Sequence, residues 1–131
     1  MHRITVIPAH NVVESTLWGF LSVDDVSGYD ADLQRHFRSG RLQAGYRMLI
    51  DVAGCAIQQQ EVINAFQAHV LGCPKASRIA AVTGSSIVRM QVRRVLNQSY
   101  MRTFTDRLAA WEWLDIDNTA EASPSPFPAA S

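Results

Sequence analysis

The residues with the clearest chemical potential are a small polar turn and an arginine about one helical turn beyond it. The turn contains Thr83, Gly84, Ser85 and Ser86, and the arginine is Arg89. If a helix begins here, its free backbone N–H groups and the positive end of its dipole attract anions. The hydroxyl groups and the guanidinium would then complete an anion-binding pocket. In the alternative interpretation, a serine only caps the helix and Gly84 only permits the turn.

The turn lacks the patterns of the common nucleotide-binding folds. It has neither the Gly-x-x-x-x-Gly-Lys of a P-loop nor the spaced glycines of a dinucleotide fold. Nucleic acid binding would require a basic surface with aromatic side chains available for stacking. The chain has a net charge of +0, and Tyr100 and Phe104 fall in a predicted strand, which favours core packing. We therefore expect no nucleotide and no nucleic acid as a ligand.

A second candidate surface is the outward side of the helix predicted over residues 87–97. Arg89, Met90, Arg93 and Arg94 all fall opposite its apolar stripe. Arg89 and Arg93 lie one turn apart, and their repulsion costs a few tenths of a kcal/mol, or roughly that order. This cost would disappear against acidic groups, and Met and Arg are enriched in protein interfaces. The pattern indicates either a protein-binding face or a solvated helix face.

The charges of the chain are unevenly distributed. Residues 75–107 contain seven basic residues and one acidic residue, a net charge of +6. Residues 1–32 contain five acidic residues and one arginine, a net charge of −4. Such asymmetry marks either a binding surface or a pairing of the two segments within the fold.

The remaining chemistry-bearing residues form no catalytic or metal-binding pattern. The four histidines are scattered, and no two of them share a helical face. His69 and Cys73 are four residues apart, but the predicted helix ends between them and no other ligands are clustered there. Asp51 ends a predicted central strand and is expected to cap the helix that follows. We expect no enzyme, metal or cofactor, and we expect two reduced thiols in Cys55 and Cys73.

The pattern along the chain predicts an α/β domain. Strands are predicted over residues 4–7, 11–21, 46–52, 79–82 and 100–104, and helices over 22–40, 57–71, 87–97 and 106–114. The first two strands form an antiparallel hairpin, and the later alternation implies parallel strands with right-handed crossovers. The result is a single mixed sheet of about five strands with about four helices. Ser27 and Gly28 interrupt the apolar spacing, which predicts that the first helix is broken or loosely wound near its start.

Length and composition limit the number of domains and the class of protein. The 131 residues, 47% of them hydrophobic, fit one domain over residues 1–115. Residues 116–131 are rich in Ala, Ser and Pro and are expected to form a disordered tail. No apolar run reaches the roughly 20 residues that cross a bilayer, and the start, MHRITVIPAH, has no long apolar segment. We expect a cytoplasmic protein without a membrane span.

Three segments in a fixed order resemble a known family. They are LWGFLSVDDV, YRMLIDVAG, and IAAVTGSSIVRMQVRR continuing to MRTFTDRLAAWEWL. In these segments the chain resembles the STAS superfamily, specifically the SpoIIAA-like branch of small bacterial proteins. The likeness spans nearly all of residues 12–114. That branch shares its sheet-and-helix plan with the CRAL-TRIO lipid-transfer domains.

The resemblance departs from the family at its phosphorylated serine. Anti-sigma antagonists carry Asp-Ser-Ser/Thr-Gly at the start of the helix after the third strand. The matching residues here run from Asp51 through Gly54 and Cys55 to Ala56, without a hydroxyl group. We therefore expect no phosphoswitch at this place. Cys55 lies near that helix start, where a dipole lowers a thiol pKa, or it is simply a small packed side chain.

These observations favour a non-enzymatic bacterial regulatory or interaction module. It would dock a protein partner, or a second copy of itself, through residues 87–97 and the nearby turns. The alternative is a protein that binds a small apolar ligand or lipid between sheet and helices, which the lipid-transfer relatives imply.

Overall fold

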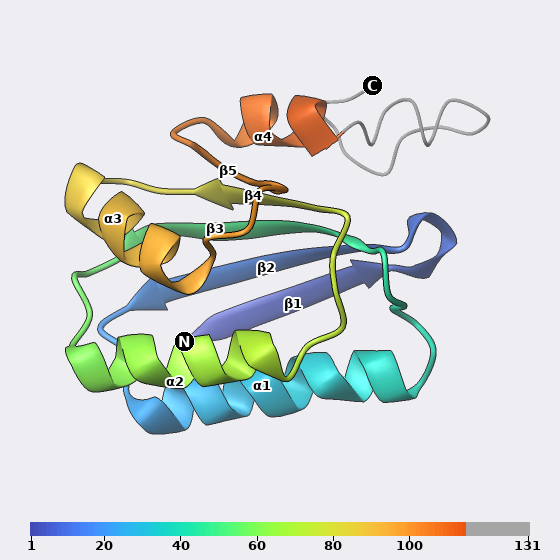
Figure 1. The fold of residues 1–131 in the computed structure, drawn as a ribbon, viewed down its shortest axis with the longest axis horizontal. Helices are drawn as coiled ribbons and strands as arrows, with labels where there is room; N and C mark the ends of the chain where they lie inside the picture. The colour runs from blue at the N-terminus through green and yellow to red at the C-terminus, as the bar shows by residue number, and fades with distance from the viewer. Residues whose placement is uncertain (115–131) are drawn as a thin grey trace.

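Five strands form one mixed sheet in the computed structural model, which describes residues 1–114 (Figure 1). The strands are β1 (His2–Ile7), β2 (Val12–Gly19), β3 (Arg47–Cys55), β4 (Arg78–Val82) and β5 (Met101–Phe104). They lie in the order β1-β2-β3-β4-β5, with β1 antiparallel to β2 and every other pair parallel. This confirms the predicted α/β fold, with β1 at an edge and β3 in the centre. The tail predicted for residues 116–131 lies outside the described residues.

Helices cover both faces of the sheet. Figure 1 shows α1 (Val23–Arg38) and α2 (Gln60–Leu71) on one side and α4 (Arg107–Leu114) on the other. The third helix, α3 (Ser86–Val95), packs beside α2. A short 3-10 helix, η1 (Pro8–His10), joins β1 to β2. None of these helices is long and apolar enough to cross a membrane.

The alternation of side chains along the central strands divides the core in two. Met48 of β3 and Ile79 of β4 are paired in register and pack toward α1, α2 and α3. The next pair, Leu49 and Ala80, packs toward α4 and contacts Trp111. Successive strand residues point to opposite faces, so a strand covered by helices on both sides carries apolar residues at consecutive positions. This explains the apolar run Met48, Leu49 and Ile50, which placed β3 in the centre.

The first helix begins at a capping box, as predicted. Asp25 N–H donates to Ser22 Oγ at 3.1 Å, and Ser22 N–H donates to Asp25 Oδ2 at 2.8 Å. The predicted break near Gly28 is wrong, because α1 runs without interruption. The buried side chains of Val26 and Tyr29 hold this turn against the sheet, and that packing offsets the low helix propensity of glycine.

The third strand continues further than predicted. It ends at Cys55 rather than Val52 because Trp18 and Gly19 of β2 pair with Gly54 and Cys55 beyond an irregularity in register. Cys55 therefore lies at a strand end, and α2 begins only at Gln60. Burial raises the pKa of Cys55 to about 11, so the expectation of a helix N-terminus that lowers it is wrong.

An ion-pair network fastens α4 to its face of the sheet. The Arg107 guanidinium pairs with Glu14 of β2, and its Nη1 lies 2.6 Å from Asp51 Oδ2 of β3. Asp51 Oδ1 also accepts a hydrogen bond from Ala53 N–H at 3.0 Å. Asp51 thus holds α4 and its own strand end instead of capping α2, which corrects the prediction from sequence.

A buried hydrogen bond links α1 to the sheet. Tyr29 Oη donates to Ser15 Oγ of β2 at 2.8 Å, and both side chains are excluded from solvent. Neither hydroxyl can exchange this partner for water, so each depends on the other.

We expect Tyr29→Phe to destabilise the fold by about 1–3 kcal/mol, because it leaves the Ser15 hydroxyl buried and unpaired. Adding Ser15→Ala should recover much of this loss, since the double variant has no orphaned polar group. Urea unfolding of the wild type, both single variants and the double variant measures the coupling. Strictly additive losses would show that the two hydroxyls do not interact.

Candidate functional site

The structure brings the four predicted partner-binding residues onto one exposed side of α3. Arg89, Met90, Arg93 and Arg94 are all solvent-exposed, and the Met90 side chain is 58% exposed. Ile87 at the start of the same helix is also exposed. The buried side of α3 is formed by Val88, with Val92 and Val95 packed against the core. The helix is therefore anchored by valines and presents a cationic and apolar side to solvent.

The other basic residues of the segment 75–107 are engaged within the fold. Lys75 lies over the Tyr100 ring, Arg78 Nη1 donates to Trp113 O at 2.5 Å, and Arg102 stacks near Phe104 and Trp113. Arg107 is the one that pairs with an acid of the first 32 residues, Glu14. Pairing between the basic segment 75–107 and the acidic segment 1–32 therefore engages one arginine of the basic segment, Arg107.

The arginines of α3 differ from all of these. Within residues 1–114, Arg89, Arg93 and Arg94 form no ion pair and no hydrogen bond through the guanidinium. Their charge is balanced by no group of the described fold. Three unpaired cations on one helix leave a local positive field that a complementary surface would neutralise.

Two further apolar side chains lie at the same edge of the sheet. Phe20, which is 62% exposed, follows β2, and exposed Ile57 follows β3. Because β2, β3 and β4 are parallel neighbours, their carboxyl ends meet at the edge where α3 begins. Neither residue was among the sites predicted from the sequence, although an apolar side chain directly after a strand end is a visible signal. We call Phe20, Ile57, Ile87, Met90 and the three arginines of α3 the carboxyl-edge surface.

Gln58 connects the loops beneath the carboxyl-edge surface. Its side-chain amide donates to Gly19 O at 3.1 Å and accepts from Leu21 N–H at 2.8 Å. Its backbone exchanges two hydrogen bonds with the Gln91 side chain of α3, at 3.0 and 2.8 Å. One glutamine thereby fixes the β2–α1 loop, the β3–α2 loop and α3 relative to one another.

The predicted anion-binding turn is only partly assembled. Ser85 Oγ accepts from Val88 N–H at 3.1 Å and therefore caps α3. Thr83 and Arg89 line one hollow of about 270 Å³, which Asp106 also lines, and a carboxylate there repels an anion. Ser86 is exposed at the first turn of α3. Binding of an anion by Thr83, Gly84, Ser85, Ser86 and Arg89 stays a prediction.

Gly84 has a packing role that its turn position did not reveal. Its φ is not positive, but an added Cβ would lie 2.6 Å from the carbonyl oxygen of Ala53. The turn after β4 therefore passes directly against the end of β3. Close backbone approach, rather than an unusual conformation, requires glycine here.

We expect Gly84→Ala to destabilise the protein by about 1–3 kcal/mol, because neither backbone can move without disturbing the sheet. Gly72→Ala is the matched control, since a Cβ there would meet its nearest neighbour at 3.6 Å and φ is −87°. It should stay within about 0.5 kcal/mol of the wild type. Thermal and urea unfolding of both variants compare them, and equal losses would refute the close-approach argument.

A cavity of about 230 Å³ lies between the sheet and helices α2 and α3. Apolar side chains such as Met48, Ile50 and Leu96 form most of its wall. Gln98 also lines it, and Gln98 Oε1 is buried without a hydrogen-bond partner. Buried polar atoms are nearly always paired, so this oxygen marks a place for a donor group.

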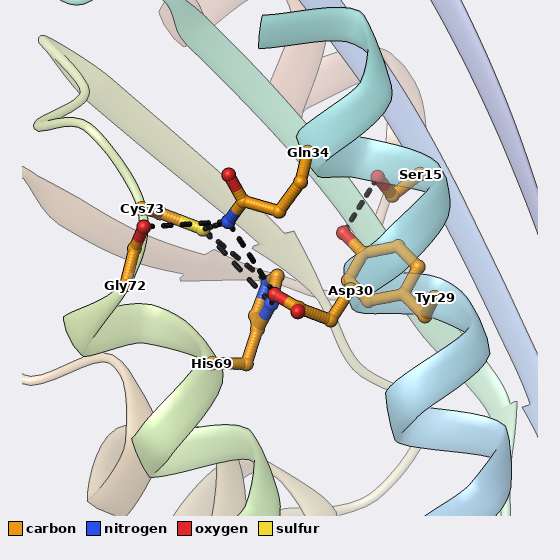
Figure 2. Close-up of polar contacts among 7 residues, drawn as sticks. All are labelled: Ser15, Tyr29, Asp30, Gln34, His69, Gly72 and Cys73. Atoms are coloured by element: carbon orange, nitrogen blue, oxygen red, sulfur yellow. Dashed lines mark hydrogen bonds and ion pairs between the residues drawn. The ribbon is translucent and has the colours of Figure 1, made fainter. Parts of the chain in front are cut away.

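A cluster of three metal-ligating side chains lies where α1 meets the end of α2 (Figure 2). Asp30 Oδ1 of α1 is 2.5 Å from His69 Nδ1 of α2, and Cys73 Sγ is 3.6 and 3.9 Å from the two nitrogens of the His69 ring. The expectation that no further ligand joins His69 and Cys73 is therefore wrong. Asp30 is 39 residues from His69, and only the packing of two helices brings them together.

The cluster contains the side chains of a nucleophilic triad, but its electrostatics oppose that chemistry. Cys73 follows the carboxyl end of α2, the negative end of the helix dipole. Burial, and then the charge of Asp30, raises the pKa of Cys73 to about 11. Reactive thiolates occur instead at helix N-termini or beside cations. The geometry gives Cys73 no activation as a nucleophile.

Comparison with known proteins leaves the family open. No protein-family model matches this chain, and no curated protein matches it in sequence. The features of the described fold that bear on function are the carboxyl-edge surface, the cavity and the Asp30–His69–Cys73 cluster.

Proposed function

We propose that this chain is a non-enzymatic regulatory module of the SpoIIAA-like, STAS type from a bacterial cytoplasm, which docks an acidic segment of another protein on α3. The observation that carries the proposal is that Arg89, Arg93 and Arg94 are exposed without an ion pair among residues 1–114. The other basic residues of the segment 75–107 are engaged by the fold; they are Lys75, Arg78, Arg102 and Arg107.

The composition of the carboxyl-edge surface supports a protein partner. Phe20, Ile57, Ile87 and Met90 can fill pockets of a partner, while the arginines can pair with its carboxylates at the rim. Apolar anchors surrounded by charged groups are the usual anatomy of an interface. The underlying Gln58 and Gln91 hydrogen bonds hold the surface rigid, which lowers the entropy cost of binding.

An acidic partner is favoured over nucleic acid by the positions of the aromatic side chains. Tyr100 lies beneath Lys75, and Phe104 packs against Trp113 with ring centroids 5.7 Å apart. Neither ring is available as a platform for stacking bases, which leaves Phe20 as the exposed aromatic of the carboxyl-edge surface. Single-stranded nucleic acid binding uses several aromatic side chains on which successive bases stack. Carboxylates of a protein satisfy the same arginines without that requirement.

We expect Arg93→Glu to weaken partner binding at least about tenfold, because it replaces an attraction with a repulsion worth about 1.4 kcal/mol or more. Arg41→Glu makes the same charge change at an exposed position outside α3 and should leave binding unchanged. The wild type, Arg93→Glu and Arg41→Glu proteins serve as baits, and the proteins that they capture are compared. The dissociation constant of each bait for the purified partner is then measured at two salt concentrations. Binding should weaken as salt rises.

Equal binding by the Arg93→Glu and Arg41→Glu proteins would contradict the docking proposal. Sedimentation of the purified chain distinguishes a homodimer. Self-association that Arg93→Glu abolishes would identify the partner as a second copy.

The cavity supports a second candidate function, binding of a small apolar molecule. Its volume of about 230 Å³ lies below the roughly 300–1,000 Å³ of typical ligand pockets. It therefore fits a compact ligand better than a complete lipid. The unpaired Gln98 Oε1 would accept a hydrogen bond from a hydroxyl or amine of that ligand.

For this function we expect native mass spectrometry of the purified chain to show a bound mass that denaturation releases. Val95→Phe should remove it, because Val95 lines the cavity and the added ring fills it. Leu108→Phe, a comparable enlargement on the exposed side of α4, should retain it. A wild-type protein without bound mass, after incubation with small apolar alcohols and amines, would rule the function out.

A further inference from the structure

We propose that Asp30, His69 and Cys73 bind a divalent transition-metal ion of the zinc class. The proposal concerns the junction of α1 and α2, which contributes nothing to the carboxyl-edge surface. It is therefore independent of the docking function.

The donor atoms already lie close to the separations that a metal requires. All three lie within 4.8 Å of one another. Zinc bonds of about 2.3 Å to sulfur and about 2.0–2.1 Å to nitrogen, in tetrahedral geometry, place these two ligand atoms about 3.6 Å apart. Cys73 Sγ lies 3.6 and 3.9 Å from the His69 nitrogens. Asp30 Oδ1 accepts a hydrogen bond from His69 Nδ1 at 2.5 Å. Withdrawal of the half-exposed Asp30 carboxylate by less than about 1 Å opens the metal position between it and His69 Nδ1.

The donor set selects the class of metal. A thiolate, an imidazole and a carboxylate together suit zinc and its neighbours, whereas magnesium and calcium take oxygen ligands. Three protein ligands leave a fourth tetrahedral position for water. Gln34 of α1 supports the site, because its Nε2 lies 3.5 Å from Cys73 Sγ and 3.4 Å from Asp30 Oδ1. Such outer hydrogen bonds orient the ligands of a metal (Figure 2).

The electrostatic surroundings favour a cation. The site lies at the carboxyl end of α2, where Gly72 is the C-cap and its carbonyl accepts from Gln34 at 3.3 Å. The helix dipole is negative at this end, and the Asp30 carboxylate adds a full negative charge. Within residues 1–114, no lysine or arginine forms an ion pair with Asp30. A bound divalent ion would neutralise these groups together.

The site combines a fixed ligand with an accessible one. The His69 side chain is only 7% exposed, and its ring packs against Tyr29 with centroids 5.2 Å apart. The Asp30 side chain is 41% exposed and lines a surface hollow of about 520 Å³, together with Gln34, His69 and Gly72. A metal ion can therefore enter from solvent and meet a histidine that the core holds in place.

Titration of the chelator-treated chain of 131 residues with Co²⁺ tests the site. We expect one equivalent to bind with a sulfur-to-cobalt charge-transfer band that Zn²⁺ abolishes. Cys73→Ser should remove the band, while Cys55→Ser, which alters the other free thiol, should keep it. Asp30→Asn should weaken Zn²⁺ binding at least about tenfold. His2→Gln, which alters the separate His2–Asp32 pair, should leave it unchanged.

Circular dichroism of the metal-free variants checks that each has folded. Zinc-loaded wild-type protein provides a readout that needs no variant, since X-ray absorption should detect one sulfur at about 2.3 Å. The proposal is overturned by a metal shell without sulfur, by a cobalt band that Cys73→Ser retains, or by the absence of stoichiometric binding.

Discussion

The arrangement of α1, α2 and α3 on their face of the sheet depends on the buried hydrogen bond between Tyr29 and Ser15. It fixes the rotation of α1 about its own axis, because a buried tyrosine hydroxyl must lie where Ser15 can accept its hydrogen. Burial raises the pKa of Tyr29 accordingly. The Tyr29 ring also contacts His2, Phe66 and His69. Once Tyr29 points into the core, the next residue, Asp30, is turned toward α2 and meets His69. The proposed metal site is a consequence of this rotation.

The opposite face shows how the fold uses its charges. Arg107 compensates Glu14 and Asp51, two carboxylates that β2 and β3 place on the α4 face. Removing a paired charge from such a network is costly, because it leaves the other charges partly buried. Within residues 1–114, the arginines of α3 form no comparable ion pair.

Local signals in the sequence were sufficient for the order of elements but not for contacts between them. The capping box at Ser22 and the apolar run of β3 act over a few residues, and both predictions are confirmed. The continuity of α1 at Gly28 depends on packing of Val26 and Tyr29 against other elements, which overrides local propensity. The extension of β3 to Cys55 depends on pairing with β2. Asp30 contacts His69 although the two are 39 residues apart in the sequence. Spacing rules relate residues within one helix or strand, so they cannot predict a contact between two helices.

The cavity shares walls with the proposed metal site and lies against the inner side of α3. His69 and Cys73 line the cavity and also belong to the cluster, so the cluster separates the cavity from the surface hollow beside Asp30. Val95 and Leu96, at the end of α3, line the cavity from another side. A cavity ligand therefore touches the inner side of the helix whose outer side carries the free arginines. Such contact couples two sites only if α3 has two positions that the ligands bind unequally. The hydrogen bonds between Gln58 and Gln91 restrain the middle of α3, and Gln67 Nε2 donates to Arg94 O at its carboxyl end at 3.1 Å, so such a displacement would have to break one of these contacts.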